Sequence, residues 1–280
     1  MPEFRFPIRY YECDAYGHLN NGSYLRYIEE AIFQGGAGLS GSEQAVAGVR
    51  HRWRIQKLAI EYLQPAYYGD IVELEVATSR QDTGRRELTF VFRRVGNDDP
   101  IASSVVETIA WESSPPQRAA LCETYGALDE RTRDLPPVPA PPEGVYTMSH
   151  GVSWHDLDMT RDVSEVTLLG LADRCGLGVI TAYGWPPERM VSEGFAIILR
   201  WHKAVFLLPA QLGDELAIAT WVSDVKRASA IRHYAIRRVA DGVLLARIDT
   251  LGVWIDIAAG RPMRIPAQFL SDFASNVSPV

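Results

Sequence analysis

The sequence is poor in cysteine and contains no long hydrophobic run. Its 280 residues include three cysteines, an odd number, which are widely spaced and form no Cys-x-x-Cys pair: Cys13, Cys122 and Cys175. A disulfide framework or a structural zinc site is therefore not expected, and this cysteine usage fits a reducing, cytoplasmic setting. No stretch approaches the roughly 20 apolar residues that span a bilayer. The N-terminal residues also lack an apolar run of signal-peptide length, so we expect no association with membranes.

The sequence also has no excess of basic over acidic residues. The formal net charge is -7 and the pI is about 5.4. Nucleic-acid-binding proteins usually present a basic face, so a nucleic-acid partner is not expected. The sequence has neither a phosphate-binding glycine loop nor a Gly-x-Ser-x-Gly nucleophile elbow. The sequence therefore predicts no cofactor.

An internal repeat dominates what is present. Residues 62–70 read YLQPAYYGD and residues 206–214 read FLLPAQLGD, so the offset between them is 206 − 62 = 144 positions. The same offset relates Asp14 to Asp158, and the pair at 93–94 to the pair at 237–238, which are all arginines. A constant offset without gaps over separate segments is hard to obtain by chance. The sequence therefore predicts two copies of one structural unit.

A proline-rich stretch separates the two copies. Residues 135–142 read LPPVPAPP. Proline fixes φ and removes an amide donor, so this stretch is predicted to be an extended, semi-rigid connector. We predict an N-terminal domain over residues 1–125, a linker over residues 126–145 and a C-terminal domain over residues 146–280.

Both copies show the same order of predicted elements. A short strand (4–11 and 146–154) leads into an aspartate-bearing turn and then into a helix whose apolar residues follow a helical period. Asn20 or Asn21 can cap the first helix and Ser164 the second, and glycines are predicted to end them at 35–36 and at 176 and 178. Four strand-like runs follow in each copy: residues 53–63, 71–79, 87–94 and 102–111, then 195–207, 215–222, 230–238 and 244–255. The predicted fold class is α+β, with an antiparallel sheet curled around one central helix in each copy.

The first turn and helix carry a specific motif. Residues 10–31 read YYECDAYGHLNNGSYLRYIEEA. The core pattern Asp-x-x-Gly-His-x-Asn-Asn, followed by a tyrosine-rich helix, resembles the 4-hydroxybenzoyl-CoA thioesterase-like hotdog family. The two-copy layout resembles the acyl-acyl-carrier-protein thioesterases. This resemblance implies two hotdog folds in tandem, hydrolysis of an acyl thioester of coenzyme A or acyl carrier protein, and an active site between paired hotdogs.

The residues of this motif suit thioester hydrolysis, which needs a carboxylate and donors that stabilise the developing oxyanion. Asp14 is predicted to be the nucleophile or the general base. Gly17 lets the backbone approach a ligand, and the amides of Gly17 and His18 are predicted to polarise the carbonyl at the helix N-terminus without a metal. The His18 ring could orient the carboxylate or contact the substrate. The remaining candidates are Asn20, as a helix cap or a residue that holds water, and Asn21, as a substrate contact. Glu61 is either a further substrate contact or a solvated strand residue.

The second copy keeps the aspartate and loses the rest of the motif. Asp158 corresponds to Asp14, but residues 161–164 read RDVS where residues 17–20 read GHLN. We interpret the second site as degenerate, so that this copy supplies the supporting face of the first site. Asp158 as a second active site is the alternative. A basic-aromatic patch at residues 51–54 (HRWR) could meet the phosphates of coenzyme A or an acidic carrier protein, or could be solvated charge.

Together the motif and the repeat predict an Asp-dependent acyl thioesterase of fatty acid metabolism. It would release a free acid and a thiol from an acyl-CoA or acyl-carrier-protein thioester. Two alternatives stay open, namely a hotdog hydratase or dehydratase that acts on the acyl chain and an acyl-CoA-binding protein without turnover. The two copies would form an internal pseudo-dimer, and pairing of two tandem chains into a homodimer is a further alternative.

Overall fold

The computed structural model describes residues 3–39, 51–82, 85–112, 137–158 and 161–279. The first copy of the repeat contains β1 (Glu3–Pro7), α1 (Asn21–Leu39), β2 (His51–Tyr62), β3 (Ile71–Asp82), β4 (Arg85–Arg94) and β5 (Pro100–Glu112). The second copy contains β6 (Tyr146–Gly151), α4 (Glu165–Ala182), α5 (Pro187–Ser192), β7 (Phe195–Phe206), β8 (Glu215–Ser223), β9 (Ser229–Arg238), β10 (Leu244–Asp256), β11 (Arg261–Pro262) and α6 (Ala267–Asp272). Short 3-10 helices add η1 (Tyr10–Glu12), η3 (Trp154–Asp156) and η4 (Ala274–Asn276). No helix in this described part of the chain is both long and apolar enough to cross a membrane.

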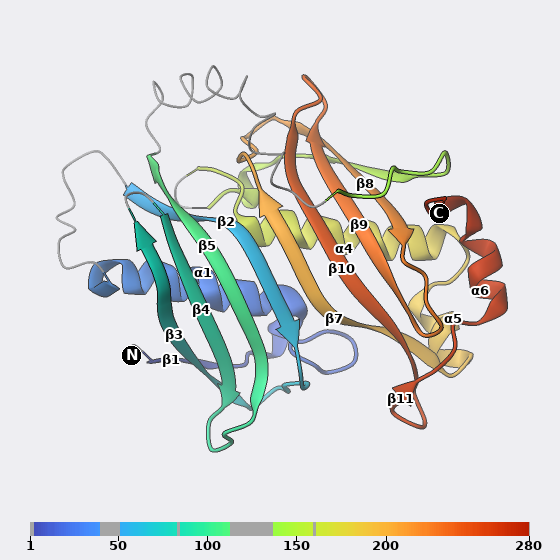
Figure 1. The fold of residues 1–280 in the computed structure, drawn as a ribbon, viewed down its shortest axis with the longest axis horizontal. Coiled ribbons are helices and arrows are strands. Elements are labelled where there is room, and N and C mark those ends of the chain that lie inside the picture. The colour runs from blue at the N-terminus through green and yellow to red at the C-terminus, as the bar shows by residue number, and fades with distance from the viewer. Residues whose placement is uncertain (1–2, 40–50, 83–84, 113–136, 159–160, 280) are drawn as a thin grey trace.

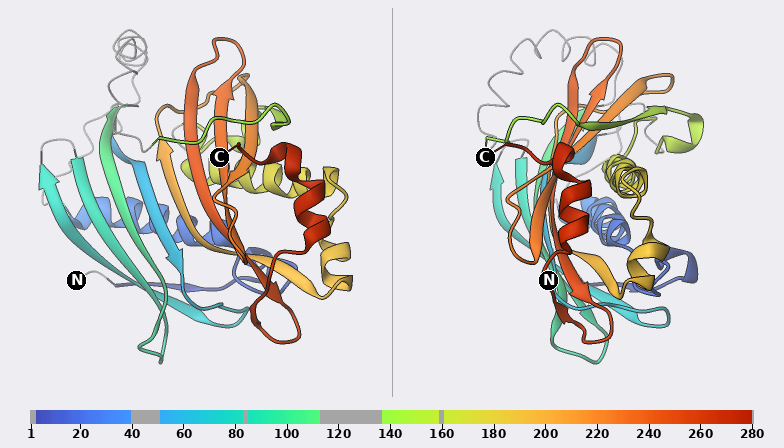
Figure 2. Two further views of the ribbon diagram at one scale, coloured as in Figure 1. Left: turned by 45° about the vertical axis from the view of Figure 1, so that its right-hand side comes forward. Right: turned by 90° about the vertical axis from the view of Figure 1, so that its right-hand side faces the viewer.

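The two copies share one antiparallel sheet. Its strand order is β1-β3-β4-β5-β2-β7-β10-β9-β8-β6, with β11 paired to β10 (Figure 1). The copies meet where residues 57–61 of β2 pair with residues 201–205 of β7. Helices α1 and α4 lie beside each other on the same face of the sheet (Figures 1 and 2). The sheet thus continues across the boundary between the copies, and each helix lies on its own half.

The offset found in the sequence holds in the structure. β2 spans 51–62 and β7 spans 195–206, so both ends differ by 144 (195 − 51 and 206 − 62). The bounds of β4 and β9, and of β5 and β10, obey the same offset. The predicted repeat and its order of elements are therefore confirmed. Each residue of the first copy can be compared with a defined counterpart in the second.

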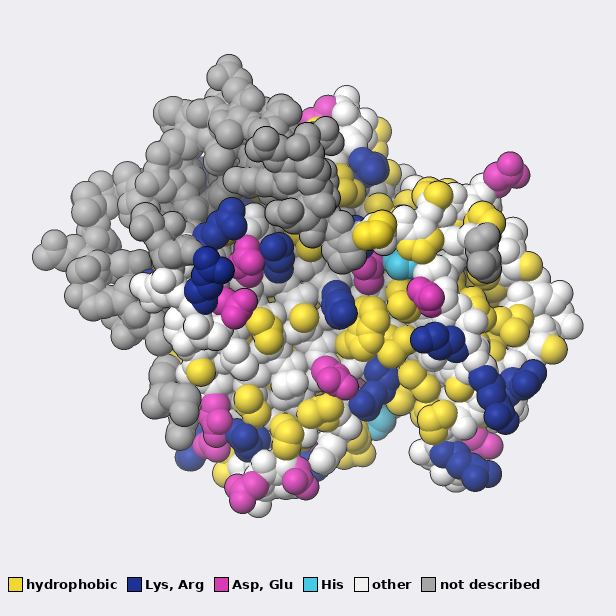
Figure 3. All heavy atoms as spheres, viewed as in Figure 1, with side chains coloured by type: hydrophobic (Ala, Val, Ile, Leu, Met, Phe, Trp, Pro, Cys, Tyr) yellow, Lys and Arg dark blue, Asp and Glu magenta, His cyan; other side chains and the backbone are white. Residues whose placement is uncertain are grey.

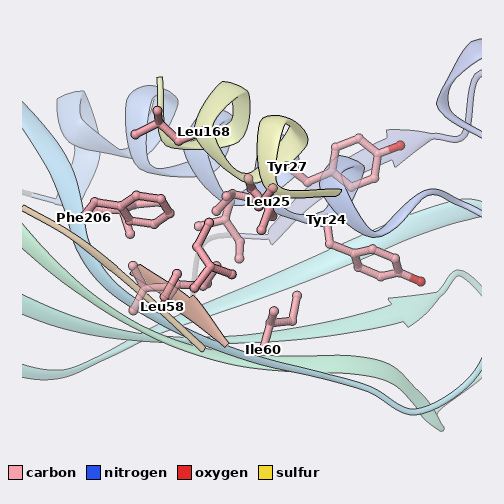
Figure 4. Close-up of a cluster of buried hydrophobic side chains, with 14 of the residues drawn as sticks. Tyr24, Leu25, Tyr27, Leu58, Ile60, Leu168 and Phe206 are labelled. Atoms are coloured by element: carbon pink, nitrogen blue, oxygen red, sulfur yellow. The ribbon is translucent and has the colours of Figure 1, made fainter. Parts of the chain in front are cut away.

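The core lies between the sheet and the two helices, and it includes residues from both copies. Leu58 and Ile60 of β2 are buried against the helices, whereas the intervening Ala59 is exposed, as the period of two in a strand requires. Leu25 of α1 and Leu168 of α4 are fully buried in the same cluster (Figure 4). Burial of each such side chain stabilises the fold by about 1.5–3 kcal/mol, so the shared apolar core also holds the two copies together.

The predicted helix ends are wrong. α1 continues through the glycines at 35–36 to Leu39, and α4 continues through those at 176 and 178 to Ala182. In α4 these glycines make room for the sheet, because a Cβ at Gly176 would lie 2.4 Å from the Tyr234 hydroxyl and one at Gly178 would lie 2.9 Å from the Tyr146 hydroxyl. They serve close packing and do not stop the helix. The predicted Ser164 cap is confirmed, since its side chain accepts the Thr167 N–H.

Two other predictions concern the ends of strands and the linker. The first strand stops at Pro7 instead of residue 11, because residues 10–12 form η1, where the Glu12 side chain accepts the Arg9 N–H. Residues 137–142 of the proline-rich stretch lie against the second copy, where Pro139 O accepts the Trp221 indole N–H and Ala140 O accepts the Ser278 hydroxyl. Residues 113–136 lie outside the described residues, so the domain boundaries stay a prediction.

Candidate active site

The predicted motif forms a tight turn that Asp14 closes. Its Oδ1 accepts the backbone N–H of Tyr16 at 2.9 Å and that of His18 at 3.1 Å. The Asp14 N–H donates to His18 O at 2.8 Å, and the Gly17 N–H donates to Asp14 O at 3.0 Å. Gly17 has φ +81°, a left-handed conformation that glycine adopts without strain. The motif therefore builds a defined loop immediately before α1.

This turn uses the two amides that the sequence assigns to the oxyanion. The N–H groups of Gly17 and His18 both donate to Asp14, so a thioester carbonyl would have to displace these bonds. Asn20 caps α1, because its Oδ1 accepts the Gly22 N–H at 2.9 Å. Within the described residues, neither the Asn21 N–H nor Asp14 Oδ2 has a hydrogen-bond partner. These two groups are therefore the donor and the acceptor that the loop offers to a ligand.

Aromatic rings and the second copy border this loop. The His18 ring lies edge-on to the Tyr67 ring, with 5.2 Å between centroids. The pKa of Tyr16 is raised by burial and further by the negative charges of Asp14 and Glu188. Glu188 belongs to α5 of the second copy. Tyr16 of this loop therefore lies within electrostatic reach of the second copy.

A polar cluster joins the copies at the start of α1. The Tyr62 hydroxyl lies 3.0 Å from His202 Nδ1 and 3.4 Å from Asn21 O. On the other side of the imidazole, Nε2 lies 3.6 Å from Oδ1 of Asp173 on α4. His202 is 0% exposed, and the Asp173 side chain is 30% exposed. Burial, followed by the charges of Asp173 and Tyr24, raises the pKa of Tyr62 well above its usual value, so the hydroxyl stays a donor.

The second copy offers no such polar cluster. The counterparts of Tyr62 and His202 are Phe206 and Leu58, which carry no polar atom and are buried in the core. The counterpart of Asp173 is Glu29, whose Oε1 accepts the Val166 N–H in the first turn of α4 at 3.2 Å. The Tyr62–His202 pair at the N-terminus of α1 therefore has two apolar counterparts at the N-terminus of α4.

The second motif keeps the turn and fills its site with an ion pair. The Arg161 N–H donates to Asp158 O at 3.0 Å, and Arg161 holds φ +67° where the first copy has glycine. Arg54 of β2 then reaches across from the first copy. Its Nε donates to Glu165 Oε1 at 2.7 Å, and its Nη1 lies 3.9 Å from Asp162 Oδ2. All three side chains are at most 5% exposed, so a buried charge cluster occupies the place that corresponds to the first site.

Two sequence-based assignments need correction. Arg54 belongs to the basic-aromatic patch that was a candidate for phosphate contact, but it is buried against these carboxylates and does not face a solvent-borne phosphate. Glu61 lies on the outer face of the sheet that Figure 3 views, because it alternates with the buried Ile60 and Tyr62. Its side chain is 55% exposed and lies 3.6 Å from Arg200. The structure therefore does not bring Glu61 to the loop.

Sequence reasoning missed the residues that the second copy brings to the first. Asp173 and His202 lie more than 150 positions after Asp14, and neither belongs to a motif. One signal was available. At an offset of 144, a tyrosine aligns with a phenylalanine (62 and 206), a leucine with a histidine (58 and 202), and an arginine with an isoleucine (54 and 198). These are positions at which polarity changes between otherwise matching strands, and such changes could have pointed to the two helix N-termini.

A second polar cluster lies on the outer face of the second copy. Ser223 Oγ is 2.7 Å from His233 Nε2, and His233 Nδ1 is 2.7 Å from Asp249 Oδ1. The sequence of contacts from serine to histidine to aspartate is that of a hydrolase triad. Ser223 is only 6% exposed and pairs with Ile231 in the sheet, however, so its hydroxyl is not presented to a substrate. We assign this cluster to stability. Among the described residues, no group of three or more His, Cys, Asp or Glu side chains could hold a metal ion.

This cluster predicts a pH-dependent contribution to stability. Burial raises the pKa of Asp249, but the hydrogen bond and charge of His233 and the charge of Arg247 outweigh it, and the net pKa lies below the usual 3.8. The contribution is therefore present above about pH 4 and is lost as the pH falls through the folded pKa. We expect Asp249→Asn to lower the free energy of unfolding by about 1 kcal/mol at pH 7 and by less at pH 3. Urea unfolding at both pH values measures this, with the exposed Asp98→Asn as control, and an equal loss at the two pH values would contradict it.

Comparisons with known proteins follow the same two-part division. The family model described as "Thioesterase-like superfamily" matches residues 8–140 and 152–273. The structure is similar to that of the 12:0-ACP thioesterase from Umbellularia californica, with a TM-score of 0.66 and 13% identity over 90% of this chain and 94% of that one. An acyl-ACP thioesterase from Bacteroides thetaiotaomicron gives a TM-score of 0.59 and 13% identity over 90% and 97%. At these identities the likeness concerns the fold. No curated protein sequence matches the chain.

Proposed function

Because the chain belongs to the thioesterase-like superfamily, we propose that it hydrolyses an acyl thioester at one site, which lies at the N-terminus of α1. The superfamily match and the structural relatives confirm the predicted architecture, an α+β chain with two hotdog folds in tandem. The observation that supports a single site is the asymmetry between the copies. The turn of the first copy presents Asp14 Oδ2 and the Asn21 N–H, whereas Arg54 and its carboxylate partners occupy the corresponding region of the second copy.

Asp14 is the proposed acid–base or nucleophilic group. Its Oδ1 is fixed by two amides, and Oδ2 has no partner among the described residues, so Oδ2 is the atom that acts. As a general base, it takes a proton from water while the water oxygen bonds to the acyl carbon; as a nucleophile, it bonds to that carbon itself. In the first case the C–S bond then breaks and the thiolate takes the proton from Asp14. In the second case the C–S bond breaks as the thiolate leaves, and water then cleaves the acyl–Asp14 anhydride, which releases the free acid, restores the Asp14 carboxylate and gives one proton to the thiolate. His18 and Asn20 support this group by closing the turn and capping α1.

The Asn21 N–H is the proposed donor to the developing oxyanion. It is the first amide of α1, and it has no acceptor within the described residues. Amides in the first turn of a helix point outward along the axis and carry the positive end of the helix dipole. Negative charge on a thioester oxygen would therefore be stabilised there, as in other oxyanion sites.

The proposed substrate is an acyl thioester of coenzyme A or of acyl carrier protein. Carrier-protein esters are included because two proteins of similar fold are acyl-ACP thioesterases. The proposal places the reaction in the cytoplasm and requires no cofactor. The pairing of β2 with β7 makes each chain an internal pseudo-dimer, so one chain carries both faces of the site, and further pairing of chains stays a prediction.

Thiol release from a panel of thioesters tests this function. The panel contains acetyl-, hexanoyl-, dodecanoyl-, oleoyl- and benzoyl-CoA, with dodecanoyl-acyl carrier protein, and a thiol-reactive dye reports hydrolysis. We expect at least one ester to be turned over well above the rate without protein. Folded protein that releases no thiol from any ester contradicts the proposal. Loss of water from a 3-hydroxyacyl-CoA without thiol release would instead support a dehydratase.

A further inference from the structure

We propose that Asp173 of the second copy is a further residue of the active site at the N-terminus of α1, and that His202 is the positioning residue that sets its orientation. This inference rests on the proposed thioester hydrolysis. It extends the site beyond the motif to three side chains that the fold brings together from both copies: Tyr62, Asp173 and His202.

The Tyr62 hydroxyl sets the tautomer of His202. Because its pKa is raised well above the usual value by burial, Tyr62 keeps its proton and donates it. The hydroxyl has two acceptors in reach, Asn21 O at 3.4 Å and His202 Nδ1 at 3.0 Å, and we assign its proton to the shorter contact. A neutral imidazole that accepts at Nδ1 carries its proton on Nε2. His202 therefore presents an N–H to Asp173.

This N–H is a buried donor that the fold leaves without a hydrogen-bond partner among the described residues. The 3.6 Å to Asp173 Oδ1 exceeds the roughly 2.7–3.2 Å of an N–H···O bond. Leaving a buried polar group in this state destabilises a fold, so its presence here calls for a role. A small rotation of the partly exposed Asp173 side chain closes the gap. The donor is thus placed to hold that carboxylate in one orientation.

The second copy indicates where the Asp173 carboxylate points. Its counterpart Glu29 (173 − 29 = 144) contacts the N–H of Val166, the second residue of α4. The counterpart of Val166 is Gly22, in the first turn of α1, and Asn20 already caps its N–H. By this correspondence the Asp173 carboxylate is directed toward the first turn of α1, and its side chain, one methylene shorter than that of glutamate, leaves the helix end uncapped. A carboxylate from the opposite copy therefore borders the same helix terminus as Asp14.

A carboxylate in this place can orient the water that attacks the thioester. Water donates one hydrogen bond to Asp173 and transfers its other proton to Asp14 as its oxygen bonds to the acyl carbon. The C–S bond then breaks, and the departing thiolate takes the proton from Asp14. Asp173 contacts the reacting water, whereas His202 acts through Asp173 and touches neither water nor ester.

Steady-state kinetics of thiol release, with the ester of the panel that wild-type protein hydrolyses fastest, test this inference. We expect Asp173→Asn to lower kcat by about 10²-fold and His202→Leu, which installs the residue of the first copy, by about tenfold, while KM changes less than about threefold. His202→Gln, whose amide can still donate to the carboxylate, should regain most of the lost kcat. The matched control is Glu29→Gln, which alters the corresponding carboxylate beside the filled site and should keep kcat within about twofold.

The outcomes separate this inference from the function on which it rests. Wild-type protein that hydrolyses no ester removes the proposed function, and the inference with it, before any variant is needed. Active wild type together with an unaffected Asp173→Asn overturns the inference alone, as does an equal loss in Glu29→Gln. Thermal unfolding of every variant shows whether it is folded. If folded His202→Leu and His202→Gln lose kcat equally, the positioning role of His202 is wrong.

Discussion

Replacing Arg54 by methionine is expected to lower the free energy of unfolding by about 3–5 kcal/mol, because it removes the guanidinium between two buried carboxylates. Asp162 and Glu165 are 0% and 2% exposed, and both belong to the second copy, whereas Arg54 belongs to the first. The variant would therefore leave negative charge in the core where the copies meet. Methionine keeps much of the apolar stem, so the loss reports the charge more than the packing.

Urea unfolding measures this loss, and two further variants identify its cause. The triple variant Arg54→Met, Asp162→Asn, Glu165→Gln carries no charge in the cluster and should recover a large part of the lost stability. Arg5→Met removes an ion pair with Glu73 whose arginine is 62% exposed, and it should cost less than about 1 kcal/mol. If Arg54→Met were no more costly than Arg5→Met, the buried cluster would not stabilise the contact between the copies.

Asp14→Asn is expected to lower kcat/KM by about 10³-fold, whereas Asp158→Asn should lower it by less than about threefold. Asparagine keeps an Oδ1 that can accept the Tyr16 and His18 amides, so the turn survives while the carboxylate is lost. Asp158 closes the same backbone turn in the second copy, but Arg54 and its carboxylates fill that region. The proposed reaction therefore depends on the first aspartate and not on the second.

Kinetics of the two variants with the same ester provide the comparison, and thermal unfolding checks that both are folded. Asp158→Asn is the matched control, because it makes the same chemical change at the same place in the repeat. Similar losses in both variants would show two working sites or a structural role for both aspartates. An unaffected Asp14→Asn would move the reaction to another carboxylate.

Much of the fold could be predicted because the repeat and the periodicity are local properties of the sequence. The offset of 144 gave the order of elements in both copies, and Ser164 was recognised as a cap from its residue type alone. Glycines misled the prediction of helix ends, because their role depends on tyrosines of the sheet that approach α4. A glycine that ends a helix and a glycine that makes room for a neighbouring strand cannot be distinguished when that strand is unknown.

The site could be predicted only as far as its motif. Asp14, Gly17 and Asn20 make their contacts within a few residues, and sequence spacing encodes such contacts. Arg54 and Glu165 are 111 positions apart, and Tyr62 and His202 are 140 apart. Their meeting depends on the pairing of β2 with β7, which no local pattern in the sequence specifies.

The pairing of β2 with β7 also means that β2 stays unpaired on one edge while the second copy is being synthesised. β2 is complete at Tyr62, but its partner strand ends at Phe206, which the ribosome adds on the order of ten seconds later. Until then β2 is paired with β5 on one side only, and its other edge has no partner strand. The carboxylates that pair with Arg54 have not been synthesised at the moment when β2 is complete. An unpaired edge can recruit a strand from another nascent chain. Folding of the first half alone is thus the stage at which polysome crowding would most readily produce misassembled chains.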